Sequence, residues 1–198
     1  MIDPYALSEA DKWDDKSLEE WFLFGICVAG KGARQTAVKL DKFLKNVIND
    51  GKFLYFCTTP FQYVRTLIEH GMLGSELWKH KMGQYKRLNK AFRGMVKIHP
   101  RTCTLEELEA SHGVGPKTAR MLLLYTRPDM KVVPLDTHIL KWLAARYDNV
   151  PKSTPPAGKR YRELEKLFID EATHKGMTPK ELDMDVWLMY ANKRKETL

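Results

Sequence analysis

The chain has 198 residues, of which 43% are hydrophobic and 29% are charged. This length and composition suit one folded domain or two small lobes, and they exclude a disordered or low-complexity chain. Lysine and arginine exceed aspartate and glutamate by 33 to 25, so the formal net charge is +8. Such a balance favours polyanionic partners such as nucleic acid, although a solvated lysine-rich face has the same composition.

The cysteine pattern indicates neither a disulfide framework nor a metal centre. Cys27, Cys57 and Cys103 are far apart and form no Cys-x-x-Cys pair, so we expect reduced thiols in an intracellular protein, with no metal and no cofactor. The first residues lack a basic stretch followed by an apolar one, and no apolar run approaches the length of a membrane span. We therefore expect an untargeted protein without a membrane partner.

Helical patterns dominate the start of the chain. Ser17 followed by Glu20 has the spacing of a capping box and predicts a buried helix over 18–29. The Gly-Lys-Gly sequence at 30–32 then interrupts the helix. Apolar residues recur at helical spacing over 37–48, which predicts a second helix with lysines on its outer face.

The next part of the chain predicts shorter helices. Thr59 and Pro60 mark the start of a third helix, and Gly71 marks its end. Residues 76–95 predict one or two further helices with a basic outer face. Residues 53–57 have strand propensity but no partner strand, so we expect a loop or a buried helical turn there.

The second half of the chain is also expected to be helical. Thr104 and Glu107 form a second capping-box pattern, which predicts a short helix directly after Thr104. Proline and glycine residues over 149–159 predict a loop, and residues 161–174 and 179–192 predict the last two helices. The fold class is therefore expected to be all-α, with roughly eight to ten helices and essentially no sheet.

The most informative stretch covers residues 105–125. A short helix is followed by Gly113, Val114 and Gly115, and a second helix begins at Pro116. Two glycines around one aliphatic residue permit a tight hairpin with accessible amides, beside the positive end of the following helix. Such a turn can hold one DNA phosphate without reading a base. A Gly-x-Gly turn without a bound anion is also common, so this alternative stays open for the turn taken alone.

The segments around the next helix extend this pattern. Lys-Thr-Ala follows the turn at 117–119, and Val-Val-Pro-Leu-Asp-Thr-His occupies 132–138. Over residues 105–147 the chain resembles the HhH-GPD superfamily of DNA glycosylases. Ser111 and His112 stand where the family commonly has Leu-Pro, and the C-terminal cysteines of its cluster-binding members are missing. The resemblance is therefore to the branches without an iron–sulfur cluster, such as the 8-oxoguanine DNA glycosylases.

This resemblance implies a two-lobed helix-hairpin-helix DNA glycosylase fold. One lobe is expected at 60–147 and carries the hairpin and the catalytic residues. Residues 1–59 and 148–198 are expected to form the second helical lobe, which completes the pocket for the base. The resemblance also implies a monomer.

Two residues match the catalytic positions of the family. Asp136 falls on its catalytic aspartate, and Lys117 falls on the position that is lysine in the members that also cleave the strand. Positive charge develops on the sugar as the base departs, and a nearby carboxylate stabilises it. A neutral lysine amine can attack the sugar carbon to form a Schiff base. The alternatives are a helix-capping aspartate and a phosphate-binding lysine.

The resemblance also implies DNA contacts and a base pocket. The hairpin residues and Thr118 are expected to hold the DNA backbone, while Lys31, Arg34 and Gln35 lie where family members fill the space left by a flipped nucleotide. The residues expected to border the base pocket are Trp21, Phe24, Trp142, Asp183 and Trp187. Aromatic residues such as these more often belong to a core, and the core is the favoured alternative for each of them.

The sequence thus predicts a DNA glycosylase with AP-lyase activity that removes an altered base from double-stranded DNA in base excision repair. Among the altered bases, 8-oxoguanine is favoured, although no motif collects the residues that would recognise it. Two alternatives stay open. One is a glycosylase for hypermodified bases of the phage type, and the other is a non-catalytic module that uses the hairpin to bind DNA structure.

Overall fold

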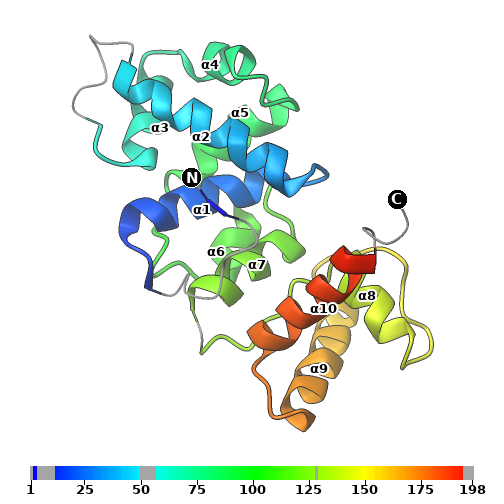
Figure 1. Ribbon diagram of the computed structural model, residues 1–198. Helices are drawn as coiled ribbons and strands as arrows, with labels where there is room; N and C mark the ends of the chain where they lie inside the picture. Colours follow the sequence, from blue (N-terminus) through cyan, green and yellow to red (C-terminus); the bar gives the residue numbers. More distant parts are fainter. Residues whose placement is uncertain (1, 4–11, 50–56, 128, 194–198) are drawn as a thin grey trace. The chain divides into compact units, whose positions relative to one another are not determined.

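The computed structural model describes residues 2–3, 12–49, 57–127 and 129–193 (Figure 1). Within these residues the regular structure is helical and no strand occurs, so the all-α prediction is confirmed. The segment predicted as a loop or helical turn at 53–57 lies outside the described residues, apart from Cys57. No helix of the described part is long and apolar enough to cross a membrane.

The chain divides into two compact units, Met1–Val114 and Gly115–Leu198. The first unit contains α1 (Asp15–Val28), α2 (Ala33–Asn49), α3 (Pro60–Glu69), α4 (Leu73–Lys79), α5 (Tyr85–Met95) and α6 (Leu105–Ala110). The second contains α7 (Pro116–Thr126), α8 (Thr137–Ala144), α9 (Lys159–His174) and α10 (Pro179–Lys193).

This division differs from the lobes expected at 60–147 and at 1–59 with 148–198. The physical reason for the difference is that each unit consists of the helices whose apolar faces are buried against one another. In the first unit α1 packs on α2, α3 and α5. In the second unit α7, α8 and α9 all contact α10, so α7 and α8 belong with the C-terminal helices.

Helix α1 supplies much of the first core. Residues 21–27 are all buried, and Trp21 stacks on Phe24 with ring centroids 5.5 Å apart. Phe43 of α2 packs against Tyr63 of α3 and Phe92 of α5, at centroid distances of 5.4 and 5.7 Å. Helix α1 is therefore buried on all sides over 21–27, whereas α2 buries one face, and both findings agree with the sequence prediction.

The start of α1 differs from the prediction. Asp14 is the N-cap, because its side chain accepts a hydrogen bond from the N–H of Ser17 at 2.8 Å. The predicted capping box of Ser17 and Glu20 is therefore wrong. Glu20 instead accepts a hydrogen bond from the N–H of Ile2 at 3.0 Å, which ties the N-terminal segment to α1.

Other predicted helix ends are confirmed. Thr59 caps α3 ahead of Pro60, and Gly71 follows that helix with a positive φ of 68°. Thr104 and Glu107 form the predicted capping box at the start of α6. The region 76–95 contains α4 and α5, so the alternative of two helices is the correct one.

The core of the second unit is built by α8, α9, α10 and the segment before α8 (Figure 1). Its buried side chains are Val133, Leu135, Ile139, Leu140, Trp142, Leu143, Tyr161, Leu164, Phe168, Ala172, Leu182 and Val186. Removing this apolar surface from water is the main stabilising contribution to such a small unit. The segment before α8 is held by this core, which matters because it ends at Asp136.

Candidate active site

Lys117 lies in the first turn of α7. Gly115 is the N-cap and Pro116 the first residue of this helix, a position where the missing N–H of proline costs no hydrogen bond. The Lys117 side chain is half-buried, and its ammonium donates to Sδ of Met121 at 3.5 Å. Among the described residues no carboxylate forms an ion pair with Lys117, so its amine is not held by a fixed counter-charge.

Asp136 is the N-cap of α8. Its Oδ1 accepts hydrogen bonds from the N–H groups of His138 and Ile139, at 2.8 and 2.9 Å. The capping role considered for this residue is therefore present. In the described part of the chain Oδ2 accepts no hydrogen bond, and the side chain is only half-buried. One carboxylate oxygen thus holds the helix, while the other keeps its lone pairs for a reacting group.

A buried carboxyl group on α10 belongs to the same site. Asp183 is only 8% exposed, and its Oδ2 accepts a hydrogen bond from the hydroxyl of Tyr125 on α7. Burial raises the pKa of Asp183 to about 7, although the hydrogen bond from Tyr125 lowers it. The charge of Asp136 raises this pKa further and that of Lys117 lowers it. Asp183, Tyr125, Asp136 and Lys117 thus interact through one hydrogen bond and through their charges, and we refer to these four side chains as the cluster.

Tyr125 is the residue of this cluster that sequence reasoning missed. Burial, followed by the charge and hydrogen bond of Asp183, raises its pKa, so Tyr125 stays a hydroxyl donor. The spacing of Lys117, Met121 and Tyr125 could have revealed it, because residues four and eight positions apart share one face of a helix. That face of α7 carries both the lysine and the tyrosine toward the acidic residues.

His138 connects the start of α8 to the same helix, α10. Its ring stacks on that of Tyr190, with centroids 5.3 Å apart and an interplanar angle of 17°. The backbone N–H of His138 is also one of the two groups capped by Asp136. The first turn of α8 is therefore tied both to Asp136 and to the helix that carries Asp183.

The raised pKa of Asp183 predicts a specific pH dependence of stability. In the folded protein this carboxyl keeps its proton up to about pH 7, whereas its ordinary pKa is 3.8. Between these values the folded state binds more protons than the unfolded state, so the free energy of unfolding falls as the pH rises through this window.

Asp183→Asn is expected to remove that fall, because an amide does not titrate while its oxygen can still accept from Tyr125. Urea denaturation from about pH 4 to pH 8 measures the difference between the variant and the wild type. Asp185→Asn, at an exposed position on the same helix, is the matched control. Parallel pH profiles for the wild type and Asp183→Asn would contradict the prediction.

The hairpin predicted at 113–115 spans the boundary between the two units. Gly113 has a φ of 82°, and a Cβ there would lie 2.9 Å from Cβ of Ala91. Val114 is buried, and its N–H donates to the carbonyl of Ser111 at 3.1 Å. A Cβ at Gly115 would meet no described atom within 4 Å. Gly113 is therefore required by packing and backbone conformation, whereas Gly115 leaves open space in front of α7.

Substitution by alanine is expected to have different effects at these two glycines. Gly113→Ala is expected to destabilise the first unit by about 1–3 kcal/mol, since it adds a clash at a positive φ. Gly115→Ala is expected to cost only about 0.5–1 kcal/mol, as a poorer N-cap, but to weaken duplex binding. Chemical denaturation and fluorescence anisotropy with a labelled duplex separate the two effects. Unchanged duplex binding by Gly115→Ala would show that the hairpin is not a phosphate anchor.

The predicted wedge residues lie in the first unit. Lys31 is half-buried, and its ammonium donates to the carbonyl of Met82 at 2.6 Å. Burial lowers its pKa, and so does the charge of Arg87. Arg34 and Gln35 are exposed in the first turn of α2. Lys31 is thus committed to a structural hydrogen bond, whereas Arg34 and Gln35 remain accessible.

Most of the other residues that were predicted to contact DNA or to border the base pocket are buried. Thr118 is 8% exposed within α7, so its hydroxyl presents little surface to DNA. Trp21, Phe24 and Trp142 are each at most 2% exposed and fit the alternative of core residues. Trp187 is half-buried. Asp183 is therefore the predicted pocket residue that the structure brings together with Lys117 and Asp136.

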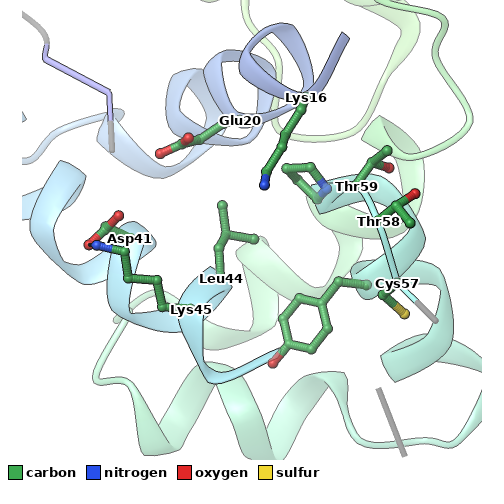
Figure 2. Close-up of a pocket in the computed structure, with 10 residues that line it drawn as sticks. Lys16, Glu20, Asp41, Leu44, Lys45, Cys57, Thr58 and Thr59 are labelled. Atoms are coloured by element: carbon green, nitrogen blue, oxygen red, sulfur yellow. Dashed lines mark ion pairs between the residues drawn. The ribbon is translucent and has the colours of Figure 1, made fainter. Parts of the chain in front are cut away.

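A separate cavity of about 220 Å³ lies in the first unit, between α1, α2 and the segment that leads into α3 (Figure 2). Lys45 and Asp41 on its wall form an ion pair at 2.9 Å. Leu44 and Tyr63 add apolar surface. None of the predicted site residues lines this cavity.

Among the described residues, no group of three histidine, cysteine, aspartate or glutamate side chains is arranged to hold a metal ion. Comparisons with protein-family models, with curated proteins and with solved structures found no significant match. The site combines an amine, a carboxylate oxygen with available lone pairs and a buried carboxyl that titrates near neutral pH. These groups are suited to nucleophilic attack coupled to proton transfer.

Proposed function

We propose that this protein is a DNA glycosylase with AP-lyase activity that removes an altered base from double-stranded DNA, acting as a monomer. The observation that carries the proposal is the clustering of Lys117, Asp136 and Asp183 within one unit. The motif resemblance over 105–147 and the net charge of +8 support the same conclusion.

In the proposed reaction, the nitrogen of Lys117 forms a bond to C1′ of the target nucleotide. The bond between C1′ and the base breaks, and its electron pair leaves with the base, which takes up a proton. The remaining N–H proton passes to O4′ as the bond between C1′ and O4′ breaks, which opens the sugar ring and leaves a Schiff base between C1′ and the nitrogen. A proton acceptor then removes a proton from C2′, a double bond forms between C2′ and C3′, and the 3′ phosphate leaves with the electron pair of its bond to C3′, which cleaves the strand.

Asp136 has the electrostatic role in this proposal. The C1′–base bond lengthens before the new bond is complete, so positive charge develops on the sugar. A carboxylate oxygen with available lone pairs, such as Oδ2 of Asp136, stabilises that charge. The cap made by Oδ1 fixes the carboxylate in place before the reaction, so little reorganisation accompanies the development of charge.

Asp183 is suited to proton exchange at neutral pH. Lys117 must lose a proton before it can attack, because an ammonium has no lone pair. The Asp183 carboxyl, with a pKa of about 7, can accept or release a proton near neutral pH. Tyr125 donates to that carboxyl and holds it in place.

The proposal is tested with labelled duplexes that each carry one altered base, including 8-oxoguanine, oxidised pyrimidines, uracil and a hypermodified phage-type base. Each duplex is incubated with the protein and sodium borohydride, which reduces a Schiff base to a stable adduct. A covalent adduct together with released base is the expected result on at least one duplex. Duplex binding without base release or adduct on the whole panel would favour the non-catalytic DNA-binding module instead.

A further inference from the structure

A buried carboxylate on α9 joins the helix of Lys117 to the segment that ends at Asp136. Oε1 of Glu165 accepts from Nε of Arg120 on α7 and from the N–H of Val133, both at 2.8 Å. Glu165 is 8% exposed and Arg120 4% exposed. One oxygen atom therefore connects two chain segments inside the second unit.

Tyr161, one turn before Glu165 on α9, holds the same segment. Its hydroxyl accepts from the N–H of Leu135 at 3.0 Å and donates to the carbonyl of Val133 at 2.9 Å. The guanidinium carbon of Arg120 lies 4.1 Å from the centroid of the Tyr161 ring. The hydroxyl thus bridges the two residues that flank Pro134, and the ring supports the cation that pairs with Glu165.

The residues that this network holds are close in sequence to both Lys117 and Asp136. Arg120 lies three residues after Lys117, about one turn along α7. Leu135 directly precedes Asp136, and its carbonyl is fixed from the other side by the hydroxyl of Thr154 at 2.6 Å. The backbone that carries Asp136 is therefore held relative to α7 by hydrogen bonds, which are directional.

We propose that Glu165, Tyr161 and Arg120 are positioning residues that hold Asp136 at its working distance from Lys117. This inference rests on the proposed function. Apolar side chains of similar volume stabilise a core as well as a buried ion pair does, so the network has little advantage as a source of stability alone. It differs from apolar packing in fixing distances, and a misplacement of about 1 Å in an active site costs about 100-fold in rate.

The test compares three variants of the full chain. Tyr161→Phe removes one hydroxyl but keeps the ring beneath Arg120, and Glu165→Gln removes the charge of the shared carboxylate at constant size. Tyr147→Phe is the matched control, because its hydroxyl also donates to a carboxylate of α9, Glu171, at 2.7 Å, whereas the described hydrogen bonds to residues 132–136 come from other side chains. Thermal melting, duplex binding and the single-turnover rate of base release are measured for each variant.

We expect Tyr161→Phe to slow base release about tenfold and Glu165→Gln about 100-fold, with the duplex Kd within about twofold of wild type. Tyr147→Phe is expected to keep the wild-type rate. Folded Tyr161→Phe and Glu165→Gln proteins with wild-type rates would overturn the inference alone. A rate loss in Tyr147→Phe equal to that in Tyr161→Phe would also overturn the inference, because it would show that lower stability alone slows base release. Absence of base release by the wild type on every duplex would instead overturn the proposed function, and this inference with it.

Discussion

Lys117→Gln is expected to abolish the borohydride-trapped adduct and to slow strand cleavage by at least about 10³-fold. The amide nitrogen of glutamine has a delocalised lone pair and cannot form a Schiff base. Glutamine retains half of the aliphatic chain of lysine and stays polar at this half-buried position, so we expect the fold to persist. Because DNA binding draws on many residues, the duplex Kd is expected to stay within about threefold of wild type.

The matched control is Lys141→Gln, at an exposed position on α8 in the same unit. It makes the same change in charge without touching the cluster, so it should trap an adduct as efficiently as wild type. An adduct of undiminished yield in Lys117→Gln would show that another amine is the nucleophile. Base release without strand cleavage in the wild type would indicate a glycosylase that uses water in place of lysine.

Asp136→Asn is expected to lower the rate of base release by roughly 10²–10³-fold, the loss typical of a removed transition-state electrostatic contact. Asparagine is as good an N-cap as aspartate, so α8 should keep its start and the protein should lose less than about 1 kcal/mol of stability. The variant therefore separates the catalytic role of the carboxylate from its capping role. Single-turnover kinetics and urea denaturation measure the two effects.

Asp14→Asn is the control for this substitution, because Asp14 is also an N-cap and accepts a backbone hydrogen bond from Ser17. It makes the same chemical change at the start of α1, in the other unit. Its rate of base release should equal that of wild type. A wild-type rate in Asp136→Asn would leave Asp136 with only its capping role and would remove the electrostatic step from the proposed reaction.

Local patterns predicted most of the helices correctly, because helix signals act within about four residues. The capping box at Thr104 and the proline start at Pro60 are examples. The start of α1 was predicted wrongly, because it depends on a contact between residues that are far apart in the sequence. Glu20 binds the N–H of Ile2, a residue 18 positions away, and Asp14 then caps the helix one turn earlier than expected.

Lys117, Asp136 and Asp183 were singled out through the resemblance to a known family. The hydrogen bonds that connect their surroundings were not predicted. Tyr125 and Asp183 are 58 positions apart, and Arg120 and Glu165 are 45 positions apart. No periodic pattern connects residues at such separations, so these contacts could not be read from spacing.

The sequence by itself determined the all-helical class, the glycine turn before α7 and the positive net charge. Each of these depends on composition or on neighbours along the chain. Only the tertiary structure decided that Asp183 is a carboxyl with a pKa of about 7 beside Lys117 and Asp136. Burial and charge at a given atom are set by everything that packs around it, and in this protein the packing brings together residues from three helices.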